Sequence, residues 1–245
     1  MKLGPASDAL LQPQRGETLH RVHRLVGVSG PHHNGPPSAP QPGEPPVKMP
    51  PWRAFPVTNT VTVLCMVIFG ICLAIGFWPV HGWLHFPELI EPGNRWQLWR
   101  LVSPALIHFS WLHIVFNVLW WFLLGRIVEF HHRSRRLIIL FFASAIIPNF
   151  AQYVVTGVDF GGLSGVVYSL FGYVWVYGHL RPGEGLHVSM TVMVQIVAWL
   201  LLGFSGLLDD WVMMANAAHL GGLMVGAFLA FLYASQPSPS GNKGH

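Results

Sequence analysis

The amino-acid sequence predicts an all-α protein, a polytopic membrane bundle of six transmembrane helices. Of its 245 residues, 52% are hydrophobic and 10% are charged, whereas soluble domains carry about 25% charged residues. The mean hydropathy is +0.45. Six apolar segments follow residue 53, and a helix of about 20 apolar residues spans the hydrocarbon core of a bilayer.

Composition divides the chain into three parts. Residues 1–53 are rich in Pro, Gly and His, and repeated prolines break helices and strands, so we expect a disordered cytoplasmic tail. Residues 54–234 hold the six apolar segments and are expected to form one membrane domain. Residues 235–245 form a short polar tail. The tail histidines lack the ligand spacing and the Cys partners of a metal site.

The apolar segments define the expected helices and the loops between them. In order, the segments are residues 57–78, 111–128, 137–155, 164–180, 188–208 and 212–233. The long loop 79–107 contains three Trp and is expected to lie in the membrane interface. Pro148 is expected to kink the third segment. Cys65 and Cys72 lie two helical turns apart in the first segment, too far apart for a disulfide bond.

The distribution of positive charge predicts the orientation of the bundle. With the N-terminus in the cytoplasm, twelve of the fourteen Lys and Arg residues lie inside, and only Arg95 and Arg100 lie outside. The reverse orientation would place those twelve charges outside. We therefore expect both termini in the cytoplasm, so that the second, fourth and sixth segments begin at the outer side.

Four polar residues of these three segments are predicted to lie at one depth. Ser164 opens the fourth segment, and His219 lies about two turns into the sixth. His113 and Asn117 lie in the first two turns of the second segment, four residues apart and hence on one face. At 1.5 Å per residue, all four fall within roughly 10 Å of one level. Polar groups in a bilayer are costly and usually face the interior of the bundle.

Small residues are expected to bring the fourth and sixth segments into direct contact. Gly222 and Gly226 form a Gly-xxx-Gly pattern after the histidine of the sixth segment, and Gly165 lies next to the serine of the fourth. Small faces let two helices approach closely, so the serine and the histidine are expected within hydrogen-bonding reach. Gly162 permits a tight turn before the serine. Tyr168, one turn after it, is expected to pack against the imidazole.

These residue types suit nucleophilic acyl transfer. Ser164 would be the nucleophile, and His219 the general base and then the general acid. His113 and Asn117, helped by the Ser164 backbone N–H, would stabilise the oxyanion. Taken singly, each residue has a plainer interpretation: a small helix-contact or cap residue, a buried histidine bonded to a carbonyl, and a hydrogen-bonded His–Asn pair.

Other kinds of site are less well supported by the sequence. Asp159, Asp209 and Asp210 are expected in outer loops, so we predict a Ser–His dyad without a triad acid. No metal and no cofactor are expected, because the chain has no His-Glu-x-x-His motif and no carboxylate or thiolate at the depth of the histidines. A channel or transporter is disfavoured because no buried acidic or basic residue completes a path.

Three motifs in this order and topology resemble those of a known family. The motifs are His113-Ile114-Val115-Phe116-Asn117, Gly162-Leu163-Ser164-Gly165 and Ala218-His219-Leu220-Gly221-Gly222. Together with Trp99-Arg100 and His108, they make residues 96–233 resemble the rhomboid family of intramembrane serine proteases, in its bacterial six-helix type. The Pro-rich tail departs from some bacterial relatives, which carry a folded cytoplasmic domain at that end.

The resemblance implies an activity, a substrate and a location. It implies that Ser164 is the nucleophile and His219 the base, that His113 and Asn117 bind the oxyanion, and that residues 54–234 are a six-helix protease domain. The implied partners are the lipid bilayer and the transmembrane helices of other proteins, cut near their outer ends, with no nucleic acid. The implied location is the bacterial inner membrane, with the active site opening to the outer side. The alternative is a non-catalytic rhomboid-like protein that binds membrane clients, although known examples lack the serine or the histidine.

Overall fold

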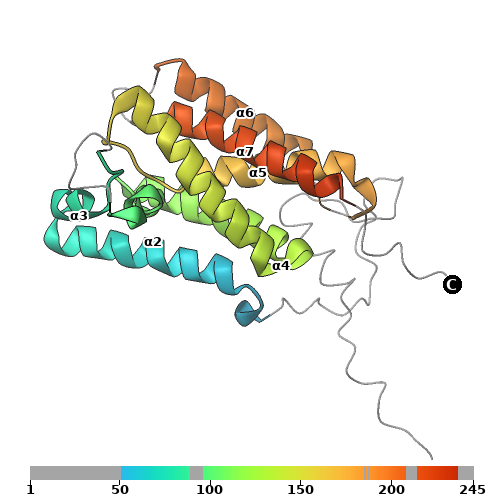
Figure 1. The fold of residues 1–245 in the computed structure, drawn as a ribbon, viewed down its shortest axis with the longest axis horizontal. Helices are drawn as coiled ribbons and strands as arrows, with labels where there is room; N and C mark the ends of the chain where they lie inside the picture. Colours follow the sequence, from blue (N-terminus) through green and yellow to red (C-terminus); the bar gives the residue numbers. More distant parts are fainter. Residues whose placement is uncertain (1–50, 89–95, 185, 187, 208–213, 237–245) are drawn as a thin grey trace, which may run out of the picture.

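The computed structural model describes residues 51–88, 96–184, 186, 188–207 and 214–236, and within these ranges every regular element is helical (Figure 1). The elements are η1 (Trp52–Ala54), α2 (Pro56–Ile75), α3 (Phe77–Leu84), η2 (Leu98–Leu101), η3 (Ser103–Leu106), α4 (Trp111–Thr156), α5 (Ser164–Leu180), η4 (Pro182–Glu184), α6 (Met190–Phe204) and α7 (Asn216–Ala234). The predicted all-α bundle is therefore confirmed. The expectations for the N-terminal tail, for Asp209 and Asp210 and for most of the C-terminal tail fall outside the described residues.

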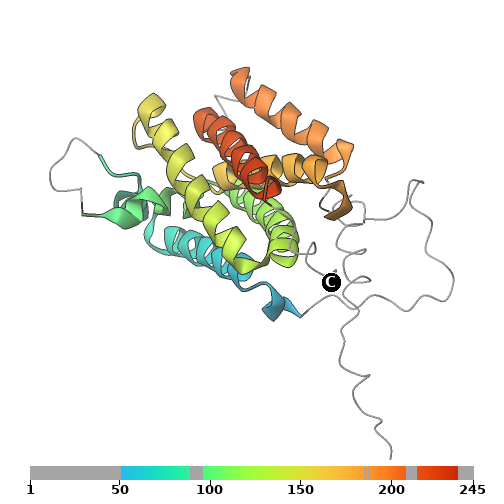
Figure 2. The ribbon, with the colours of Figure 1, turned by 45° about the vertical axis from the view of Figure 1, so that its right-hand side comes forward.

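By length and composition, α2, α4 and α7 could each cross a membrane, and α6 is a shorter apolar helix. The 46 residues of α4 would measure about 69 Å in one straight helix, more than twice the hydrocarbon thickness of about 30 Å. Its backbone leaves helical geometry at Arg133, with φ 64° and ψ 164°, and the two halves run side by side in both views (Figures 1 and 2). The two halves of α4 are therefore the second and third apolar segments of the sequence.

The prediction of a separate loop between those two segments was wrong. Helix continues on both sides of Arg133, which alone makes the reversal. Glu129, just before it, is buried and accepts hydrogen bonds from the backbone N–H of Val57 and Thr58, both at 2.9 Å, and from the Ser134 hydroxyl at 2.7 Å. These bonds satisfy free N–H groups at the start of α2 and tie the reversal to that helix.

Other boundaries also differ from the predictions. The first helix ends at Ile75, because Gly76 adopts φ 96°, and a second short helix, α3, follows inside the predicted loop. Helix α4 continues through Pro148, and the residue inside it that departs from helical angles is Arg133. The helix predicted at 188–208 is shorter at both ends. Both cysteines are buried and free, as expected.

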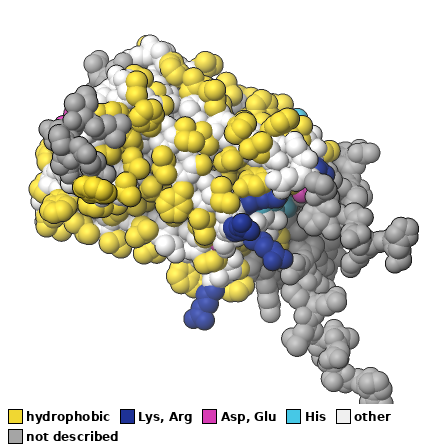
Figure 3. Space-filling model, viewed as in Figure 1, with side chains coloured by type: hydrophobic (Ala, Val, Ile, Leu, Met, Phe, Trp, Pro, Cys, Tyr) yellow, Lys and Arg dark blue, Asp and Glu magenta, His cyan; other side chains and the backbone are white. Residues whose placement is uncertain are grey.

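The core surrounds α5. Its neighbours in both views are α7 and α4, while α6 lies along the edge of the bundle (Figures 1 and 2). Trp121 of α4 and Leu170 and Tyr173 of α5 are fully buried in this core. The outer surface is also largely apolar, and positively charged side chains gather toward one end (Figure 3). An apolar exterior around a packed interior suits a protein whose solvent is lipid.

Candidate active site

The loop before α5 is shaped for close approach to a neighbouring side chain. Gly162 has φ 120°, and its N–H donates to the Pro104 carbonyl at 2.9 Å. A Cβ at this position would lie 2.5 Å from Nε2 of His113 and 3.7 Å from Oγ of Ser164. Both the backbone conformation and the space therefore require glycine here. The expected tight turn before the serine is present, and it brings His113 to the edge of the loop.

Ser164 is the first residue of α5, and its hydroxyl lies against His219 of α7. The distance between His219 Nε2 and Ser164 Oγ is 2.8 Å. The imidazole is buried, with 5% of its surface exposed, and stacks on the ring of Tyr168 with 4.7 Å between ring centres and 26° between planes. The expected contact between serine and histidine and the expected packing of Tyr168 on the imidazole are both present.

Among the described residues, none accepts a hydrogen bond from the second ring nitrogen of His219. Its Nδ1 is buried and has no hydrogen-bond partner within the described part of the chain. Asp159, which the sequence left as a remote triad candidate, is exposed and makes no hydrogen bond to this nitrogen. The described residues therefore hold a Ser–His pair with no carboxylate behind the histidine.

Glycines set the distance between α5 and α7. A Cβ at Gly222 would collide with the carbonyl oxygen of Gly165, and one at Gly226 would collide with the carbonyl oxygen of Ser169. Gly172 of α5 meets the carbonyl of Leu223 in the same way. The predicted close contact between these two helices is confirmed, and it is this contact that places the histidine beside the serine.

The two candidate oxyanion donors are placed differently. His113 lies in the first turn of α4, which the Ser110 side chain caps, and its Nδ1 accepts a long bond of 3.4 Å from the Phe109 N–H. Nε2 is then free to carry the ring proton, and it points at Gly162. The Asn117 amide donates to the His113 carbonyl at 2.9 Å, within its own helix, and keeps one further N–H.

Gln152 is a site neighbour that the sequence argument missed. It lies in the second half of α4, is 3% exposed, and its Oε1 accepts from the backbone N–H of Ala218 at 3.1 Å. That bond satisfies an N–H of the first turn of α7, next to His219. Its signal in the sequence was a lone amide in an apolar run, which does not reveal which helix it will contact.

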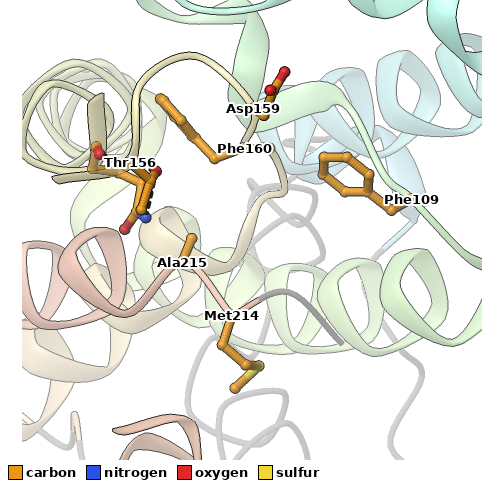
Figure 4. Close-up of a pocket in the computed structure, with 8 residues that line it drawn as sticks. Phe109, Thr156, Asp159, Phe160, Met214 and Ala215 are labelled. Atoms are coloured by element: carbon orange, nitrogen blue, oxygen red, sulfur yellow. Dashed lines mark hydrogen bonds between the residues drawn. The ribbon is translucent and has the colours of Figure 1, made fainter. Parts of the chain in front are cut away.

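A cavity of about 240 Å³ opens beside this cluster (Figure 4). We call it the loop cavity, because much of its wall comes from the loops that precede α5 and α7. Its lining residues are Phe109, Gln152, Thr156, Asp159, Phe160, Gly161, Met214 and Ala215. Within the described ranges, no three His, Cys, Asp or Glu side chains form a group suited to a metal ion.

The family of the chain follows from comparison with known proteins. Residues 95–236 match the family model for the rhomboid domain. The chain belongs to the rhomboid family. Its rhomboid domain contains all the candidate residues described above, with α4 to α7, whereas α2 and α3 precede it. With its apolar helices, the match identifies a multi-pass membrane protein.

The curated relatives carry the name of an enzyme. "Rhomboid protease GlpG" of Yersinia pestis (strain Pestoides F) and of Yersinia enterocolitica serotype O:8 / biotype 1B are each 40% identical to this chain over 179 residues. The alignment covers 73% of this chain and 63% of each relative. The chain thus spans less than two thirds of the length of the relatives that it matches.

Proposed function

We propose that this protein is an intramembrane serine endopeptidase that cuts transmembrane segments of other membrane proteins near their outer ends. The observation that carries the proposal is the 2.8 Å contact between His219 Nε2 and Ser164 Oγ, at the N-terminus of a helix, where no described carboxylate lies behind the imidazole. Membership of the rhomboid family and the names of the relatives support the same activity.

In the proposed reaction, acylation and deacylation each move one proton through His219. His219 Nε2 takes the hydroxyl proton while Ser164 Oγ attacks the scissile carbonyl, and then gives that proton to the departing amine as the C–N bond breaks. Water hydrolyses the acyl-enzyme with the same histidine as base. Because Nε2 must be unprotonated at the start, the ring proton sits on Nδ1, and stacking on Tyr168 supports the ring orientation.

The negative charge of the tetrahedral intermediate would form near the first turn of α5. Helix N-termini offer unpaired N–H groups and a positive dipole end, and His113 Nε2 lies at the adjacent Gly162. Asn117 would contribute through its remaining N–H, after its side chain turns from the His113 carbonyl toward the site. We therefore assign oxyanion stabilisation to the Ser164 N–H, His113 and Asn117.

The proposed location and domain organisation rest on charge and composition. We place the protein in a bacterial inner membrane, with both termini in the cytoplasm and the site opening outward, because that orientation keeps twelve of fourteen Lys and Arg inside. Residues 54–234 would form the protease domain, between a disordered tail and a short polar tail. A substrate helix must unwind locally, since its carbonyls are hydrogen-bonded within the helix.

Loss of the serine or of the histidine is expected to abolish cleavage. We would compare purified wild type with Ser164→Ala and His219→Ala in proteoliposomes containing a transmembrane test substrate. Each should reduce cleavage by at least about 10³-fold, because both groups take part in the same proton transfer. Ser205→Ala and His179→Ala, which change exposed residues of the same types, are the matched controls and should cleave normally.

The same preparations separate the proposed function from its alternative. A fluorophosphonate probe should label wild type and both control variants but not Ser164→Ala. Undiminished cleavage by folded Ser164→Ala would contradict the proposal. Absence of both labelling and cleavage in folded wild type, with retention of a membrane client, would support the non-catalytic binding protein instead.

Cleavage is also expected to depend on pH in one direction. A protonated His219 cannot accept the serine proton, so the rate should fall about tenfold per pH unit once the medium is more acidic than the pKa of that imidazole. The measurement is kcat/KM in proteoliposomes buffered equally on both sides, with His179→Ala as the control for an exposed histidine. A rate that does not fall at any acidic pH at which the protein stays folded would argue against His219 as the base.

A further inference from the structure

The loop cavity adjoins the reacting atoms through both loops that form it. Gly161 lines the cavity and directly precedes Gly162, which lies against the Ser164 hydroxyl. Ala215 lines it from the other side, and its carbonyl accepts the backbone N–H of His219 at 3.0 Å. A group seated in the cavity would therefore lie one residue from the nucleophile loop and beside the first turn of the histidine helix.

Two further contacts connect the cavity to the oxyanion side of the site. Phe109 lines the cavity and stacks on His113, with 6.0 Å between ring centres and 17° between planes. Gln152 lines it as well and binds the N–H of Ala218, next to the catalytic histidine. The cavity thus borders the surroundings of Ser164, His113 and His219, and none of these three residues lines it.

The size of the cavity suits one side chain. Its volume of about 240 Å³ is below the roughly 300–1,000 Å³ of pockets that hold drug-sized ligands. Phe109, Phe160, Met214 and Ala215 form an apolar part of the wall (Figure 4), and the remaining side chains of the lining are those of Gln152, Thr156 and Asp159. Such walls suit the apolar stem of a long side chain that continues from a substrate segment bound at the serine.

Asp159 gives the loop cavity a negative charge. Among the described residues that line it, Asp159 is the one with a charged side chain. In Figure 4 it lies between Phe160 and Phe109, with its carboxylate directed away from Ala215. The carboxylate is exposed and makes no hydrogen bond or ion pair within the described part of the chain, whereas the Gln152 amide is already occupied by Thr156 and Ala218.

Among the described residues, no neighbouring cation compensates that negative charge. Burial, followed by the nearby His85, lowers the pKa of His81, the titratable neighbour that Asp159 influences, so this imidazole is neutral at pH 7. Arg100 is engaged elsewhere, since its guanidinium donates to the Gly82 carbonyl at 2.6 Å and lies 3.1 Å from His85 Nε2. Within the described part of the chain, the Asp159 carboxylate is therefore open to pair with a cation brought by a ligand.

We propose that the loop cavity receives one substrate side chain close to the scissile bond, and that Asp159 makes lysine or arginine the preferred residue there. Such side chains place an apolar stem against apolar walls and keep the charged head at the wet rim, and the aromatic rings add attraction for a cation. An acidic side chain would face the carboxylate and be rejected. This inference rests on the proposed protease function and adds a substrate class to it.

The test is a charge scan of one cleaved transmembrane substrate. The scissile bond is mapped by mass spectrometry, and each of the flanking residues is then replaced in turn by Lys, Leu and Glu. With wild-type protein in zwitterionic proteoliposomes, one position should show Lys cleaved faster than Glu by on the order of tenfold in kcat/KM. Asp159→Lys should reverse the preference at that position alone, and Asp159→Asn should remove it.

Glu88→Lys is the matched control, because Glu88 is a carboxylate between α3 and η2 that does not line the cavity. It should keep the wild-type preference. A preference that Asp159→Lys and Asp159→Asn leave unchanged, or that Glu88→Lys alters equally, would overturn the role of Asp159 while Ser164-dependent cleavage stands. If Asp159→Lys does not fold, Asp159→Asn decides. Absence of Ser164-dependent cleavage in wild type would overturn both proposals.

Discussion

Two apolar helices of similar length, α5 and α6, have opposite surroundings. Twelve of the 17 residues of α5 are buried, against three of the 15 residues of α6. Apolar composition cannot separate the two, because in a membrane the lipid is as apolar as the protein interior. What distinguishes α5 is its small residues on the face toward α7, and these decide which helix becomes the centre of the bundle.

The attachments of the two helices differ in kind as well as in extent. The backbone carbonyls of α5 lie against the glycines of α7, so that Gly222 and Gly226 leave no room for a Cβ. In contrast, α6 is held by two polar contacts near the site: Asn216 donates to the Gly203 carbonyl at 2.7 Å, and Tyr168 donates to the Ile196 carbonyl at 3.5 Å. The serine–histidine distance therefore depends on the α5–α7 contact, not on α6.

Of the substitutions considered, Gly222→Ala is expected to disrupt the α5–α7 contact most strongly. The added Cβ would strike the carbonyl oxygen of Gly165, and a backbone atom cannot yield unless the two helices separate. We expect destabilisation of about 3 kcal/mol, at the upper end of overpacking effects, and loss of most cleavage because His219 moves away from Ser164. Thermal unfolding in detergent and the cleavage assay measure the two effects.

Gly221→Ala is the neighbouring control for that prediction. A Cβ at Gly221 would meet nothing closer than 3.5 Å, at the Cα of Pro148, which is ordinary van der Waals distance. Its stability should stay near that of wild type or rise by up to about 1 kcal/mol, since Ala favours helix over Gly. Equal loss of stability in the two variants would show that the α5–α7 contact is not set by fit at Gly222.

The sequence was sufficient where one local pattern determined the result. The fourth segment was predicted at 164–180, the bounds that α5 has, because a glycine-flanked serine marks its start. The contacts between His219, Ser164 and Tyr168 followed from helical spacing, the expected orientation and small residues. These features depend on one or two helices at a time, which is the range over which spacing carries information.

Features that depend on a third element were not predictable in this way. The chain reverses in α4 at Arg133, a non-glycine residue at positive φ, which is uncommon. The hydrogen bonds of Glu129 hold this reversal beside α2. The partner of Gln152, on α7, depends on the packing of both helices. The hydrogen bond of Asn117 to its own helix competes with the predicted role, and residue spacing alone does not decide between the two.

A matched pair of leucines tests the contrast between α5 and α6 with one chemical change. Leu170 of α5 is fully buried, whereas Leu201 of α6 is 64% exposed. Leu170→Ala should cost about 2 kcal/mol, the low end for buried leucines, because in detergent or lipid the helices gain from packing more than from leaving water. Leu201→Ala should cost less than about 0.5 kcal/mol, as for other exposed positions. Thermal unfolding in the same detergent measures both changes. If the two variants lost equal stability, α6 would be packed in the membrane as tightly as α5, which would contradict the exposure of Leu201 in this structure.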